Sequence, residues 1–106
     1  MTRTFWKRKL QFFLEPEPTL HPAGEDVYIP REKLKVAFWF EGGLKVSGGP
    51  RDLQVNFNDP QILTLSLQTK RTNRIFRVPY SRIVCFELVH SEEDDNTEFS
   101  RRLFLN

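Results

Sequence analysis

The sequence predicts a mainly β domain, either a small β-barrel or a two-layer β-sandwich of about seven or eight antiparallel strands, with room for one short terminal helix. Several short runs alternate apolar and polar residues, and alternating side chains leave opposite faces of a strand. Turn-forming residues separate these runs. The ten phenylalanines among the 106 residues also suit the pleated, half-buried surface of a sheet.

The clearest alternation lies between residues 53 and 68. Leu63, Leu65 and Leu67 share one parity, while polar residues occupy the other. The run from 53 to 57 repeats this pattern, with Leu, Val and Phe at its odd positions. Residues 58–60 (Asn-Asp-Pro) form a turn signal between the two runs. Both runs are therefore expected to be half-buried strands.

The next segment predicts a hairpin followed by a central strand. Residues 69–73 are polar and suit a hairpin loop, and Pro79 ends the strand that follows. Residues 83–89 are almost wholly apolar, which indicates a strand buried on both faces. Cys85 in this strand is the sole cysteine, so no internal disulfide or cysteine-based zinc site can form. A buried, reduced cysteine fits a cytoplasmic location.

An earlier hairpin is predicted around two glycines. Residues 34–41 alternate cleanly, and Gly42-Gly43 joins them to a second apolar run at 44–46. Both glycines can take positive φ without steric cost, as a tight hairpin turn requires. Residues 48–50 (Gly-Gly-Pro) are expected to form a bend or a bulge. The stretch 41–50 is not a phosphate-binding loop, because it lacks the Gly-Lys-Ser/Thr ending and a following helix pattern.

The N-terminal segment, residues 1–14, mixes four basic residues with six large apolar ones. Both helical and strand spacing fit, and the aromatic content favours a strand. We interpret it as an edge element with solvated lysines, in preference to a targeting segment or a peripheral membrane contact. Residues 15–26, with three prolines, are expected to be a loop.

One domain is expected, with residues 27–90 as its β core. Residues 91–98 form an acidic loop, and residues 99–106 suit a closing strand or a short helix about equally. No apolar run reaches the roughly 20 residues of a membrane span.

The sequence offers no catalytic, metal-binding or cofactor-binding pattern. His21 and His90 lie far apart, without a nucleophile motif beside either one. The acidic run lacks the glycine and the spacing of a calcium-binding loop. We therefore expect a protein that is not an enzyme and needs no metal or cofactor.

The leading hypothesis is an adaptor that binds another protein or itself. Trp39 lies on the polar parity of its strand, between Lys35 and Glu41. An exposed tryptophan with a polar rim is typical of an anchor in a protein interface.

The alternative hypothesis is binding of RNA or single-stranded DNA. Cations next to exposed aromatic rings on a β-surface hold phosphates and stack bases. The candidate residues are Lys70, Arg71, Arg74, Arg77, Tyr80 and Arg82, with Trp39 as a second stacking residue. The same cations could also simply keep an exposed sheet edge from aggregating.

Overall fold

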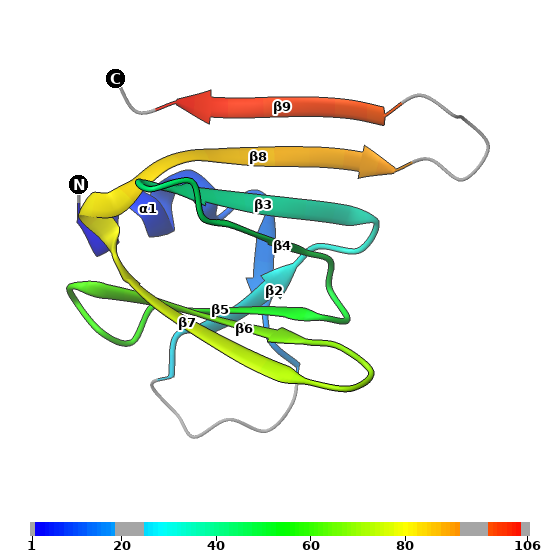
Figure 1. The fold of residues 1–106 in the computed structure, drawn as a ribbon, viewed down its shortest axis with the longest axis horizontal. Helices are drawn as coiled ribbons and strands as arrows, with labels where there is room; N and C mark the ends of the chain where they lie inside the picture. The colour runs from blue at the N-terminus through cyan, green and yellow to red at the C-terminus, as the bar shows by residue number, and fades with distance from the viewer. Residues whose placement is uncertain (1, 19–24, 92–97, 105–106) are drawn as a thin grey trace.

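Two antiparallel sheets pack face to face in the computed structural model, which describes residues 2–18, 25–91 and 98–104 (Figure 1). Within these residues, one sheet has five strands and the other four. The order of the first is β1 (Leu14–Pro16), β2 (Val27–Pro30), β5 (Leu53–Asn56), β6 (Ile62–Gln68) and β7 (Asn73–Pro79). The order of the second is β4 (Lys45–Gly48), β3 (Leu34–Phe40), β8 (Ile83–Ser91) and β9 (Glu98–Phe104). The mainly β class is confirmed, and the sandwich describes it better than a closed barrel does.

The predicted parity defines the core between the sheets. Leu63 and Leu65 of β6 are fully buried, as are Leu53 and Val55 of β5, while Leu67 is partly exposed. These side chains belong to one apolar cluster together with Val36 and Phe38 of β3 and with Phe86 of β8. Burial of each such side chain stabilises the fold by about 1.5–3 kcal/mol.

Strand β8 is buried on both faces over most of its described length. Phe86 and Leu88 face the core, and Cys85 and Glu87 are buried on the opposite face. Val84 is the exception, because the register against β3 shifts there and leaves Val84 43% exposed in a β-bulge. The prediction of a buried Cys85 is therefore confirmed.

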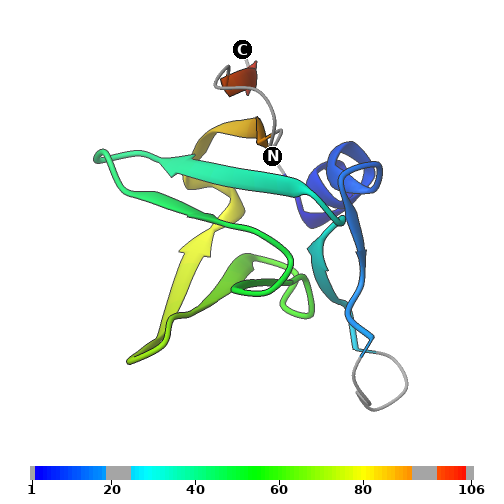
Figure 2. The same cartoon turned by 90° about the vertical axis from the view of Figure 1, so that its right-hand side faces the viewer.

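The expected strand over residues 1–14 is wrong for most of its length. Residues Arg3–Leu10 form helix α1, and Thr2 caps it by accepting a hydrogen bond from the Phe5 amide at 3.4 Å. The helix lies beside β1 and β2 (Figure 2), and it buries Trp6 and Leu10, which are four residues apart on one face. Lys9 is exposed beside this apolar face and does not interrupt it.

The start of the Pro-rich segment also differs from expectation. Residues 14–16 pair with β2, although 15–26 were expected to be a loop. With this short strand the described residues form nine strands, where about seven or eight were expected. Residues 19–24, including His21, and the acidic residues 92–97 lie outside the described residues. Of the two alternatives for the C-terminal segment, the structure has the strand, β9.

The Gly42-Gly43 hairpin is confirmed. Both glycines have positive φ, 92° and 90°, and the Phe40 amide donates to the Leu44 carbonyl at 2.9 Å across the turn. No helix in the described ranges is long and apolar enough to cross a membrane.

Gly48 provides a test of how closely the two sheets approach. A Cβ atom there would lie 2.8 Å from Leu53 Cβ and 3.2 Å from Leu67 Cδ1, which belong to the other sheet. Gly48→Ala should therefore lower the free energy of unfolding by about 1–3 kcal/mol in urea denaturation. At neighbouring Gly49 the nearest atom to a new Cβ is 3.6 Å away. Gly49→Ala should stay within roughly 0.5 kcal/mol of the wild type, and equal losses would contradict this account.

Candidate functional site

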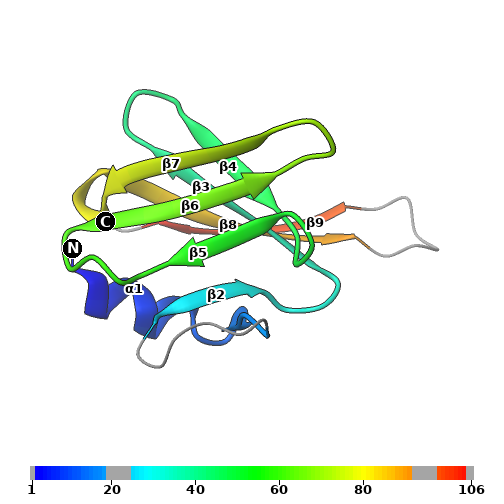
Figure 3. The ribbon, with the colours of Figure 1, turned by 90° about the horizontal axis from the view of Figure 1, so that it is seen from below.

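Strand β7 forms an edge of the five-stranded sheet (Figure 3). It pairs with β6 from Asn73 to Pro79, and in the described part of the chain no strand pairs with its other side. Backbone groups on such an edge can pair with a further strand.

Hydrogen bonds at both ends of the β6–β7 ladder show which backbone groups face outward. The Thr69 amide donates to the Thr72 carbonyl at 2.8 Å, and the Tyr80 amide donates to the Gln61 carbonyl at 3.2 Å. Hydrogen-bonded and non-hydrogen-bonded pairs alternate along an antiparallel ladder. Counting from either end, the N–H and C=O groups of residues 73, 75 and 77 point away from β6. Pro79 is also outward and has no N–H, so the row of free donors ends there.

The side chains of all these outward residues are exposed. Ile75 is 62% exposed, an unusual position for a large aliphatic side chain. Arg77 lies two residues further on the same face, where it reaches Asp59 at 4.0 Å. Because this ion pair is exposed, it contributes less than about 1 kcal/mol and leaves Arg77 free to change partner.

The hairpin turn holds two further cations in solvent. Thr69 Oγ1 accepts a hydrogen bond from the Thr72 amide at 3.0 Å, and the two threonine hydroxyl oxygens lie 2.8 Å apart. Lys70 and Arg71 lie between these threonines and are exposed. Arg74 is also exposed, with its guanidinium carbon 5.2 Å from the centre of the Phe76 ring. Four of the predicted cations therefore gather along one hairpin.

The other two residues of the nucleic-acid hypothesis do not belong to this group. Tyr80 was expected to be an exposed stacking residue, which is wrong, because it is only 2% exposed and its ring stacks on Phe57. Its hydroxyl donates to the Asp59 carbonyl at 3.0 Å. Arg82 is exposed at the other end of β7, as the last residue of the 3-10 turn Tyr80–Arg82.

The residues of the adaptor hypothesis lie on the outer face of the four-stranded sheet or next to it. Trp39 is half-buried, with Lys45 opposite it on β4 and the Lys45 Nζ atom 4.9 Å from the ring centre. The expectation of a freely exposed indole is therefore wrong, since a lysine already occupies one face of the ring. Lys35 is exposed on the same strand. Glu41, the residue after this strand, is also exposed, and its backbone amide donates to the Arg82 carbonyl at 2.9 Å.

Within the described residues, no group of three or more metal-ligating side chains comes together. No family model, curated protein or solved structure matches this chain. The sequence reasoning overlooked Ile75, although its parity with Arg77 indicated that both would face outward.

The buried hydroxyl of Tyr80 makes stability depend on pH in the alkaline range. Burial, the main cause, raises the pKa of Tyr80 from 10.0 to about 12. Because the folded state favours the protonated form, this contribution is complete below pH 10 and is lost as the pH rises towards 12. The free energy of unfolding should fall by about 2–3 kcal/mol over that interval.

Tyr80→Phe serves as the control, because it keeps the ring that stacks on Phe57 and removes the titrating group. At pH 7 the variant should be about 1 kcal/mol less stable, since the bond to the Asp59 carbonyl is lost. Between pH 10 and 12 its stability should fall less than that of the wild type, as measured by urea denaturation. If the free energy of unfolding falls equally with pH in the two proteins, burial does not raise the pKa of Tyr80 and this account is wrong.

Proposed function

We propose that this chain is a non-enzymatic protein-binding module that takes an extended, acidic segment of a partner protein as an added strand on β7. The observation that supports it is the outward row of backbone groups at residues 73, 75 and 77, bordered by exposed cations. In strand addition, main-chain hydrogen bonds supply affinity and alternate side chains supply specificity.

The side chains of β7 indicate which partner sequence would fit. Ile75 and Arg77 lie two residues apart on the outer face, so they would contact partner residues of the same period. An apolar side chain suits the exposed Ile75, and a carboxylate suits Arg77. Lys70 and Arg71 at the hairpin tip favour further acidic residues at one end of the segment.

The described surface fits a polypeptide better than a nucleic acid. Binding of single strands combines phosphate contacts with bases stacked on aromatic rings. Tyr80 is buried, and Phe76 is half-buried beside the Arg74 guanidinium. The hairpin therefore offers phosphate contacts without an open stacking surface, whereas its free backbone groups suit a peptide.

Charge also disfavours pairing of β7 with a second copy of itself. Two such hairpins would bring eight cations together, because each copy carries the same four residues: Lys70, Arg71, Arg74 and Arg77. Like charges across a strand pair are destabilising. A partner of opposite charge removes this repulsion, so we favour a different protein over self-association.

A synthetic peptide of about eight residues with the repeat Val-Thr-Glu-Thr provides the direct test, because valine and glutamate two residues apart lie on one face of a strand and can meet Ile75 and Arg77. In NMR titrations with labelled protein, we expect saturable shifts along β7 and slower amide hydrogen exchange at Ile75 and Arg77. Ile75→Pro should weaken binding at least tenfold, because it removes an outward N–H while leaving the ladder to β6 intact. The double variant Arg71→Glu/Arg77→Glu should weaken it by a similar factor.

Arg8→Glu/Lys9→Glu is the matched control, since it changes the net charge equally at exposed positions of helix α1, which lies beside β1 and β2 at the far edge of the sheet from β7. It should bind the peptide nearly as well as the wild type. Equal weakening in both double variants would mean that only net charge matters. A single-stranded oligouridine of about ten nucleotides forms the second arm. If it binds the hairpin with steep salt dependence while the peptide does not, the nucleic-acid hypothesis replaces the proposal.

A further inference from the structure

Three turns of the chain border a groove of about 700 Å³ at one end of the sandwich. They connect β2 to β3, β4 to β5 and β6 to β7, and they lie together on the right-hand side of Figure 1. This volume is within the range of small-molecule sites. The charged residues of the lining are Lys33, Lys35, Arg51, Lys70, Glu32 and Asp52. Four cations thus face the groove against two carboxylates.

Backbone hydrogen bonds fix the turns that carry these cations. The Leu34 amide donates to the Arg31 carbonyl at 3.0 Å and closes the first turn. The Gln68 amide donates to the Asp52 carbonyl at 2.7 Å and joins the second turn to the end of β6. Because the backbone of the groove is already ordered, a ligand would pay less entropy on binding.

The basic side chains of the groove have no partners of their own. All four are exposed, and none forms an ion pair or a side-chain hydrogen bond with the part of the chain that the structure describes. Asp52 differs, because its carboxylate accepts a hydrogen bond from the Gly49 amide and so stabilises the second turn. Cations gathered in a groove concentrate their field, which attracts an anion.

Lys33 has a backbone conformation that is unfavourable for lysine. Its φ is 67°, the sole positive value at a non-glycine position within the described ranges. The Cβ atom makes this region costly, so glycine or asparagine is the usual occupant. Glycine would therefore suit the turn better, whereas lysine adds a charge to the groove. Strained positions of this kind cluster at functional sites.

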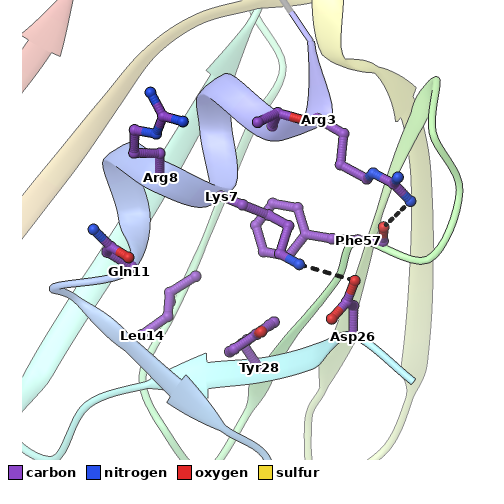
Figure 4. A pocket seen from close by; sticks show the side chains of 9 residues that line it. Arg3, Lys7, Arg8, Gln11, Leu14, Asp26, Tyr28 and Phe57 are labelled. Carbon is purple, nitrogen blue, oxygen red and sulfur yellow. Dashed lines mark hydrogen bonds and ion pairs between the residues drawn. The ribbon is translucent and has the colours of Figure 1, made fainter. Parts of the chain in front are cut away.

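The cleft between helix α1 and strand β2 is less suited to an anion (Figure 4). There Lys7 forms an ion pair with Asp26 at 2.9 Å. Arg3 donates to the Phe57 carbonyl at 3.4 Å, and Arg8 points away from it. The cations of that cleft are either paired or directed apart, unlike those of the groove.

We infer that the groove between the three turns binds a compact polyphosphate, an anion with adjacent phosphate groups and no aromatic part. Ammonium and guanidinium groups form strong charge-assisted hydrogen bonds with phosphate oxygens. The described lining contains no aromatic side chain on which a nucleotide base could stack. It also contains none of the large exposed apolar side chains, which a membrane contact would need besides charge. A free polyphosphate therefore fits better than a lipid headgroup.

Tripolyphosphate is the probe for this inference. Titration into labelled protein should give saturable amide shifts at residues 32–35, 49–52 and 68–70. Inorganic phosphate should bind at least about tenfold more weakly, because one phosphate reaches fewer cations. Adenosine triphosphate should bind no more tightly than tripolyphosphate, and tighter binding would contradict a ligand without an aromatic part.

The double variant Lys33→Gly/Arg51→Gln should weaken tripolyphosphate binding at least about tenfold, because it removes two of the four cations. Lys33→Gly alone should keep or raise the urea concentration at the midpoint of unfolding, since glycine accepts positive φ without strain. A loss of binding in this variant therefore cannot be attributed to a loss of folding.

Lys45→Gln/Arg82→Gln is the matched control. It removes two exposed positive charges at the other end of the sandwich, where β4 and β8 begin (Figure 1). This variant should bind tripolyphosphate like the wild type. Equal weakening in the two double variants would overturn the site, and so would the absence of saturable shifts at the three turns.

The inference is independent of the strand addition proposed for β7. Ile75→Pro should lose the peptide and keep tripolyphosphate, so each proposal can fail without the other. Vesicles that carry a doubly phosphorylated inositol lipid form the last arm. If they bind the protein more tightly than tripolyphosphate does, and Lys33→Gly/Arg51→Gln abolishes this binding, the ligand is a lipid headgroup and a free polyphosphate is wrong.

Discussion

The structure depends on the exclusion of water from the facing sides of two open sheets. Across this interface the sheets share one apolar cluster. On the side of the four-stranded sheet, Phe38 of β3 and its neighbour Phe86 of β8 belong to this cluster, with ring centres 5.1 Å apart. An open sandwich leaves gaps beside its outer strands, and helix α1 fills one of them with Trp6 and Leu10. Unlike a closed barrel, it also leaves strand edges unpaired, so the architecture that forms the core exposes β7.

Local parity predicted much of the fold, because a half-buried strand has a period of two regardless of its neighbours. It identified the buried residues of β5 and β6 and the turn at Gly42-Gly43. It failed for residues 3–10, where apolar spacing fits helix and strand alike. There the tertiary structure decides. In a strand Arg8 would share the buried face of Trp6 and Leu10, whereas the helix leaves Arg8 exposed. The order of the strands was only partly within reach of local pattern. Five of the seven neighbouring pairs are consecutive along the chain, whereas β2–β5 and β3–β8 join distant segments.

For the candidate site, parity was reliable within strands and unreliable where they end. It placed Arg77 outward, as observed, but it said nothing of Tyr80, which follows Pro79 in a 3-10 turn that directs its ring inward. The covering of Trp39 by Lys45 depends on the length of the hairpin loop. A two-residue turn at Gly42-Gly43 would pair Phe40 with Lys45, whereas the observed loop of residues 41–43 pairs Trp39 with Lys45.

The features that protect β7 from aggregation are the same ones that would select its partner. Proline and basic side chains are common devices for blocking unwanted pairing at sheet edges. Here Pro79 ends the row of donors, and the cations of the hairpin repel a second copy of the strand. Neither device blocks the backbone groups of Ile75 and Arg77, and neither opposes an acidic chain. Since repulsion of like strands and attraction of acidic ones arise from the same charges, protection and specificity are two consequences of one arrangement.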